Sequence, residues 1–327
     1  MDVFAQGVPV DWSQARPLLR PVLRPQSYVT ATTQRDDPIW ARQLWPLVSE
    51  LAVVDLPDRR VVVTVAATER WGVTGLDAFA AARENLAARS PEVTPGQKVM
   101  LRDADGGTYV DALIVVDGWL SSLAVPGQGQ PLVFMPGDGA LLVGTDDPAD
   151  APGLFEAAER MYLDADRFIS PQAYTIGDGT IVPLDLAGPH PMRHLALRAR
   201  AVQATREYGS QTDFLQDHYE REMIPQYVGR VGAVETPWGV RTLSVWGKGA
   251  EWDLPETDYI MIGTNQDGSD LFTIPFGVLV DAIGLRPLPG PVPARYRTPP
   301  FPSVEILTEL RAHAVDLPPS SVARTRT

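Results

Sequence analysis

Hydrophobic residues in the first half of the chain alternate between the spacing of strands and the spacing of helices. Two β-branched runs, 51–56 and 61–67, flank a short polar turn, which predicts a β-hairpin. Thr74 and Asp77 have the spacing of a capping box, and apolar residues then recur at helical intervals up to Ser90. The same reasoning predicts a strand at 97–102, a helix at 111–120, a hairpin at 132–135 and 140–144, a helix at 154–168, and strands at 173–176 and 180–184.

The second half follows a different pattern after the breaker residues Ala187, Gly188 and Pro189. A long helical stretch, 192–223, is expected to be interrupted near Gly209. Strand-like runs then alternate with turn residues and predict an antiparallel series. The runs and the elements after them are strands at 227–234, 240–246, 259–263 and 271–274, a helix at 276–283, an extended proline-rich linker at 286–302 and a last helix at 303–313.

These elements predict an α+β protein of two domains. The first, 1–187, combines hairpins and helices, behind a lead-in up to Arg35 whose prolines favour extended chain. The second, 188–327, has one or two helices followed by a mostly antiparallel sheet. A length of 327 residues agrees with two domains of ordinary size.

The order of several short segments in the first half resembles a bacterial family of unknown function, the YtpQ-like family. The resemblance covers roughly residues 15–187 and implies no activity, because the family has no established biochemistry. The segments that carry it are Arg20-Pro21-Val22-Leu23-Arg24, 52–56, 78–86, Asp111-Ala112, Val133-Phe134-Met135-Pro136 and Ile169-Ser170-Pro171.

Charge narrows the classes of function. The chain has 28 basic and 41 acidic residues, a net charge of -13, which argues against nucleic acid as the main partner. Residues up to Ala187 carry 14 basic and 25 acidic side chains, a net of -11, and the remainder carries 14 and 16, a net of -2. The arginines at 16, 20, 24, 59 and 60 could pair with carboxylates of this acidic half or contact an anionic partner.

Cysteine is absent, so the sequence offers no disulfide, no thiolate metal site and no cysteine nucleophile. The first twenty residues lack the basic and apolar regions of a signal peptide, and apolar runs are too short to cross a bilayer, so we expect a cytoplasmic protein without a membrane partner.

Three of the eight tryptophans, Trp238, Trp246 and Trp252, lie within fifteen positions. Alternation on the strand 240–246 places Trp246 on the face with Thr242 and Ser244, opposite Leu243 and Val245. If the apolar face is the core, Trp246 points outward and the three tryptophans form a recognition surface. If neighbouring helices cover that face, they close a second small core.

No catalytic, metal or cofactor signature stands out. His190 and His194 have the spacing of a helical zinc pair, but Pro191 places His190 before the helix or at its cap. His218 and Glu222 share a helix face, which is most simply an exposed pair. Glycine-rich nucleotide loops and nucleophile motifs are missing, so we predict no cofactor, no metal and no identified catalytic residue.

The leading hypothesis is a non-enzymatic protein-interaction module, such as an adaptor, immunity-like or chaperone-like protein, with a protein partner that could be basic; a homo-oligomer is also possible. The first alternative is an enzyme that uses aspartate, glutamate and His218 in a cleft between the domains. The second is a structural subunit of a larger assembly.

Overall fold

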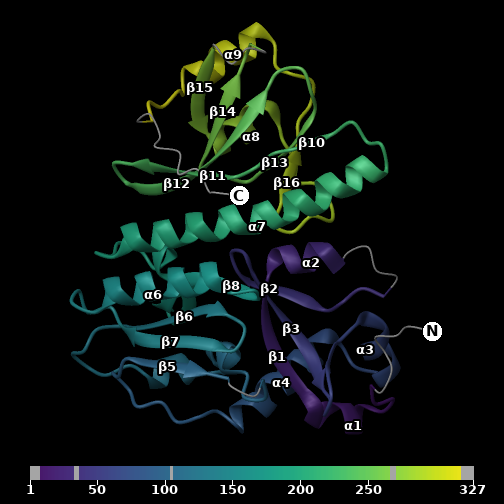
Figure 1. The fold of residues 1–327 in the computed structure, drawn as a ribbon, viewed down its shortest axis with the longest axis vertical. Coiled ribbons are helices and arrows are strands. Elements are labelled where there is room, and N and C mark those ends of the chain that lie inside the picture. Colours follow the sequence, from purple (N-terminus) through teal and green to yellow (C-terminus); the bar gives the residue numbers. More distant parts are fainter. Residues whose placement is uncertain (1–7, 33–36, 104–105, 266–269, 318–327) are drawn as a thin grey trace. The chain divides into compact units, whose positions relative to one another are not determined.

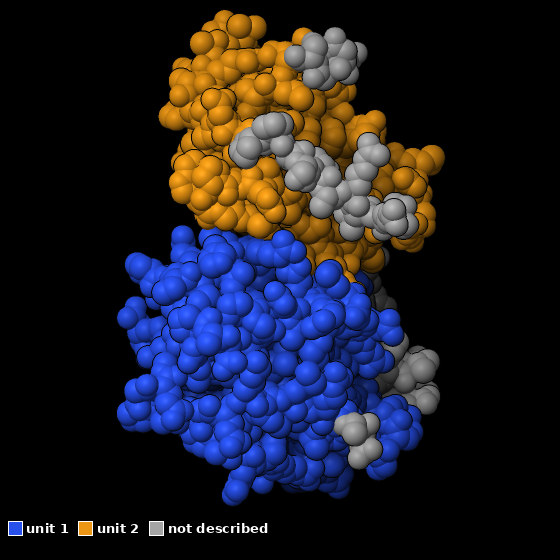
Figure 2. Space-filling view, turned by 60° about the vertical axis from the view of Figure 1, so that its left-hand side comes forward, with its two compact units in different colours: residues 1–199 blue, residues 200–327 orange. Residues whose placement is uncertain are grey.

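The computed structural model describes residues 8–32, 37–103, 106–265 and 270–317. The chain divides into two compact units, Met1–Ala199 and Arg200–Thr327 (Figures 1 and 2). Both units combine helices with largely antiparallel sheets, which confirms the α+β class. The sequence places the boundary at Ala187, whereas the units divide at Ala199, inside the long helix α7 (Arg193–Arg221).

Unit 1 contains two antiparallel sheets. The first has the order β1-β3-β2 with β4 also paired to β3, and the second has the order β5-β7-β6-β8-β9. The strands are β1 (Leu19–Pro25), β2 (Ala41–Trp45), β3 (Val48–Asp55), β4 (Arg60–Val62), β5 (Val99–Arg102), β6 (Pro131–Gly137), β7 (Ala140–Thr145), β8 (Phe168–Gly177) and β9 (Thr180–Pro183). The helices are α1 (Trp12–Ala15), η2 (Arg16–Leu18), α2 (Gln26–Thr32), α3 (Val65–Trp71), α4 (Gly75–Ala87), η3 (Val110–Val115), α5 (Trp119–Ser122), α6 (Ala151–Asp164) and η4 (Leu184–Leu186).

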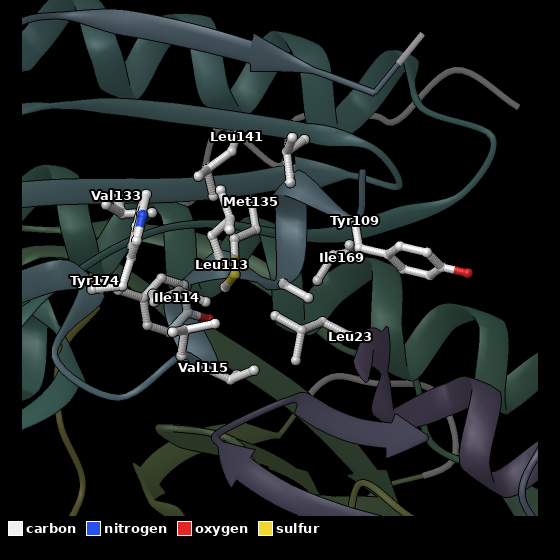
Figure 3. Close-up of a cluster of buried hydrophobic side chains, with 14 of the residues drawn as sticks. Leu23, Tyr109, Leu113, Ile114, Val115, Val133, Met135, Leu141, Ile169 and Tyr174 are labelled. Atoms are coloured by element: carbon white, nitrogen blue, oxygen red, sulfur yellow. The ribbon is translucent and has the colours of Figure 1, made fainter. Parts of the chain in front are cut away.

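The two sheets of unit 1 face each other across the main core. Alternate residues of one strand point to opposite sides, so Val53 joins the core between the sheets while Ala52 and Val54 pack against α3 and α4. On the second sheet, Phe134 packs under α6 in the same way. The short helix η3 lies between the sheets, and Figure 3 shows its Leu113, Ile114 and Val115 among the side chains of β6 and β8.

Local signals predicted several of these elements. Thr74 accepts a hydrogen bond from the Asp77 amide, and Asp77 accepts one from the Thr74 amide, which forms the predicted capping box of α4. The hairpins β3–β4, β6–β7 and β8–β9 are confirmed. The second strand of the first hairpin ends at Val62, earlier than predicted, because Thr64 caps helix α3. The predicted helix 111–120 is divided into η3 and α5, with Gly118 at a φ of 75° before α5.

Unit 2 contains the rest of α7, two sheets and two short helices. The sheets have the orders β10-β13-β16 and β11-β12-β14-β15. The strands are β10 (Tyr227–Val228), β11 (Gly232–Thr236), β12 (Gly239–Gly247), β13 (Trp252–Pro255), β14 (Tyr259–Gly263), β15 (Leu271–Pro275) and β16 (Arg295–Arg297), and the helices are α8 (Phe276–Ile283) and α9 (Val304–Arg311).

The mostly antiparallel arrangement predicted for unit 2 is confirmed, and three details differ from the prediction. Helix α7 continues through Gly209 without a break. The series of strands is not antiparallel throughout, because β13 leaves the larger sheet and the chain returns in β14 parallel to β12; β10 and β13 are also parallel. The proline-rich segment 286–302 is more than a linker, because it contributes β16 and the fully buried Arg295.

Candidate protein-binding surface

Trp238 is the exposed member of the three tryptophans. It lies in the turn between β11 and β12, with 65% of its surface accessible. Its backbone amide donates to the hydroxyl of Thr236 at 3.2 Å, so the turn is fixed while the indole stays in solvent. An exposed tryptophan on an ordered turn is typical of a recognition residue.

The sheet that carries Trp238 has one partly open apolar face. The strand register places Leu243, Val245, Met261 and Leu271 on this side, which we call the open face. Val245 is 45% and Leu271 is 48% exposed. A groove of about 320 Å³ crosses the open face and is bordered by the chain segment 314–317. The Val315 amide donates to the Thr273 carbonyl at 2.8 Å and so ties this segment to β15.

Trp246 lies on the opposite face of β12 and is fully buried. It packs with Ile260, Ile262 and α8, and its ring is 5.2 Å from that of Phe301. The predicted alternation is right. Of the two alternatives for this face, the second holds: helices cover it, so Trp246 belongs to a core and not to a recognition surface. The polar neighbour Thr242 is tolerated inside because its hydroxyl and amide both bond to Asp258.

Trp252 lies at the edge of the same core. Its indole N–H donates to the Gly247 carbonyl at 3.1 Å, and its ring stacks on half-exposed Tyr227 with centroids 5.3 Å apart. The structure therefore places Trp246 and Trp252 in one core and leaves Trp238 outside it. Of the three predicted binding residues, only Trp238 has a largely accessible side chain.

Arg295 organises the interior of unit 2, and sequence reasoning missed its role. Its five guanidinium N–H groups meet five acceptors: the Gln211 and Thr212 side chains and the carbonyls of Tyr208, Gly229 and Asp253. Burial lowers the pKa of Arg295 to about 10. The only sequence signal was an arginine between prolines, which does not distinguish a buried hub from a linker.

The Asp253 carboxylate forms a second polar cluster beside this hub. Fully buried Asp253 accepts hydrogen bonds from Tyr219 at 2.6 Å, from Gln226 at 3.2 Å and from Arg297 at 2.9 and 3.1 Å. Burial and the bond to Asp253 raise the pKa of the Tyr219 hydroxyl to about 12. Each partner of the carboxylate is a donor, so the cluster holds α7, β13 and β16 together in a charge-balanced way.

One described histidine, His190, contacts a carboxylate, and its contacts are those of a helix cap. His190 Nε2 lies 3.0 Å from Asp146, and its Nδ1 accepts from the Met192 amide at 3.1 Å, which is a cap before α7. His218 is half-buried beside the Tyr219 ring, and its predicted enzymatic role stays a prediction. Among the residues that the structure describes, no three histidine, aspartate or glutamate side chains form a group that could hold a metal ion.

The basic residues of unit 1 mostly contact its own carboxylates. Arg16 pairs with Glu84, Arg24 with Asp138, and Arg60 lies 3.9 Å from Asp55 and over the Tyr109 ring. Arg20 differs, because it is buried and donates to the carbonyls of Pro17 and Leu19. The first interpretation, pairing within the acidic half, therefore holds for most of these arginines.

The carboxyl group of Asp111 is buried and has a raised pKa. It lies at the start of η3 and accepts a hydrogen bond from the Gly139 amide at 3.1 Å. Burial and the neighbouring Asp138 raise the pKa of Asp111 to about 6, against the opposing effect of Arg24. Sequence reasoning placed Asp111 in a predicted helix and in a segment of the YtpQ-like resemblance, and assigned it no role.

No helix in the described ranges is both long and apolar enough to span a bilayer. Searches against family descriptions, curated proteins and solved structures gave no match. The YtpQ-like resemblance therefore stays a prediction.

Proposed function

We propose that the protein is a non-enzymatic, cytoplasmic protein-interaction module and that it binds a basic protein through Trp238 and the open face. The observation that carries this proposal is the exposed Trp238 on a turn of the same sheet whose open face exposes Val245 and Leu271. Aromatic anchors beside apolar surface supply much of the free energy of protein association.

The charge of the chain supports a basic partner. A net charge of -13 attracts positively charged proteins and raises their association rate, while the apolar face supplies the contact area. Raising the ionic strength is then expected to slow association more than it changes the dissociation rate.

Site-specific photocrosslinking in the cells that produce the protein tests the surface directly. The photoreactive residue p-benzoylphenylalanine replaces Trp238 or Val245, and two exposed control positions, Leu163 on α6 and Val304 on α9, receive the same residue. We expect one basic protein to be captured from positions 238 and 245 and not from the controls. Equal capture at all four positions contradicts the proposal.

The second measurement is the affinity of the full chain for the captured protein after that protein has been purified. Trp238→Ala is expected to weaken binding at least tenfold, while its free energy of unfolding stays that of the parent protein. Unchanged affinity in Trp238→Ala refutes the proposed surface. A crosslink to a second copy of this chain replaces the basic partner by self-association and also refutes the proposal.

A further inference from the structure

A cavity of about 310 Å³ is lined by residues of unit 1 alone. Its apolar wall includes Trp45 from β2, Ile114 from η3, Leu120 from α5 and Ile181 from β9, and Arg83 from α4 is its cationic lining residue. Figure 3 shows Ile114 and Val115 beside the Tyr174 ring at one end of the core. The volume is at the lower end of those of small-molecule sites, about 300–1,000 Å³.

The wall of this cavity, which we call the Arg83 cavity, is held in place by specific contacts. The indole N–H of Trp45 donates to the Ile181 carbonyl at 2.8 Å, and its ring lies 4.6 Å from the Tyr174 ring. These contacts join β2 to the β8–β9 hairpin. A preformed wall lowers the entropic cost of ordering a ligand site.

The guanidinium of Arg83 uses only part of its binding capacity. Its Nε and Nη2 donate to the two oxygens of Glu50 at 2.7 and 2.8 Å. Arginine has five N–H donors, so three remain, two of them on Nη1. Within the described part of the chain these three have no acceptor. The free edge, formed by Nη1 and Nη2, has the geometry that binds a second carboxylate through two hydrogen bonds.

The charge of the group around Arg83 is unbalanced. Glu50 is fully buried and also accepts two hydrogen bonds from Arg42, so one carboxylate serves two guanidinium groups. The three side chains together carry a net charge of +1. Arg42 is directed to the Phe79 ring, with its Cζ 5.0 Å from the ring centroid, which leaves Arg83 as the cation that lines the cavity.

We propose that the Arg83 cavity binds a small organic carboxylate with an apolar body. Its carboxylate is held by the free edge of Arg83, and its body packs on Trp45, Ile114 and Ile181. Three more polar residues line the cavity and are exposed: Asp117, Ser121 and Thr180. The Asp117 carboxylate could hold an ammonium group. A simple carboxylate and an apolar amino acid would therefore both bind to Arg83, and only the amino acid would also bind to Asp117.

Calorimetric titration of the full chain tests this proposal with phenylacetate, its neutral analogue phenylacetamide, and L-phenylalanine. We expect phenylacetate or L-phenylalanine to bind with a dissociation constant of about 1 mM or lower, and phenylacetamide at least tenfold more weakly. Arg83→Met removes the preference for the carboxylate. Asp117→Asn weakens L-phenylalanine selectively if the ligand class is an amino acid, and leaves both acids unchanged if it is a simple carboxylate.

A matched pair of variants keeps the test independent of the stability of the Glu50 cluster. Ser121→Trp narrows the cavity, whereas Ser122→Trp changes the next exposed residue of α5, which does not line it. Binding lost in Ser121→Trp and kept in Ser122→Trp supports the site. Equal binding of phenylacetate and phenylacetamide, full binding in Ser121→Trp, or no binding of either acid at 10 mM, about ten times the expected dissociation constant, overturns it.

Discussion

Replacing Asp111 by asparagine tests whether this buried carboxylate lowers the stability of unit 1 at neutral pH. The side chain is 3% exposed, and its pKa is raised from the ordinary value of 3.8 to about 6. The folded state therefore binds the Asp111 proton more tightly than the unfolded chain does. Stability from this group is fully present below the unfolded pKa and is lost as the pH rises from about 4 to about 6.

The size of the effect follows from the shift. About two pKa units correspond to about 3 kcal/mol of unfolding free energy, since each unit is about 1.4 kcal/mol. Asparagine is neutral at every pH and keeps an oxygen for the Gly139 amide. We expect Asp111→Asn to match the parent protein near pH 4 and to exceed its stability by about 1–3 kcal/mol above pH 7.

This difference is measured by unfolding both proteins in urea at several pH values. Pulsed hydrogen exchange in peptides of unit 1 reports how much of unit 1 is unfolded. The exchange readout separates unit 1 from unit 2, so a single two-state transition is not required. Asp117→Asn, an exposed substitution on the next loop, serves as control and is expected to change stability by less than about 0.5 kcal/mol. A variant that is less stable than the parent at pH 7.5, or a difference that is flat from pH 4 to 8, refutes the reasoning.

Three further predictions concern stability and use the same unfolding measurement. Trp246→Ala is expected to cost about 3–5 kcal/mol because it empties the core of unit 2, whereas Trp238→Ala costs less than about 0.5 kcal/mol; similar losses would mean that the burial assignments are wrong. Glu50→Gln leaves two guanidinium groups without their anion and should destabilise unit 1 by about 3 kcal/mol, so a neutral result contradicts the cluster. Arg295→Met leaves buried carbonyls without donors and should lower the unfolding free energy of unit 2 by about 3–5 kcal/mol. Arg230 forms an exposed ion pair with Asp213, so Arg230→Met should change the unfolding free energy very little.

Short-range patterns allowed most elements of this fold to be predicted. The capping box of Thr74 and Asp77 and the hairpin of β6 and β7 depend on residues a few positions apart. Such elements can therefore be predicted from the amino-acid sequence. Helix α8 was predicted with its observed bounds because a strand and a glycine delimit it.

The functional features depend on long-range packing, which the sequence order does not display. Trp246 is buried because α8 and α9 cover its face of the sheet, although its strand neighbours there are polar. Glu50 and Arg83 are 33 positions apart, and Arg295 bonds to residues up to 87 positions away. No local spacing marks such pairs, so the Arg83 cavity and the Arg295 hub could be found only in three dimensions.

The Arg295 hub also has a consequence for the order in which the chain folds during synthesis. Its acceptors lie at 208–212, 229 and 253, and the side chain that joins them comes later in the chain than all of them, at position 295. Unit 1, in contrast, contains its own hydrophobic clusters within the first 199 residues. On the ribosome, unit 1 is thus free to fold early, while the interior polar groups of unit 2 cannot find their common donor until residue 295 has been translated.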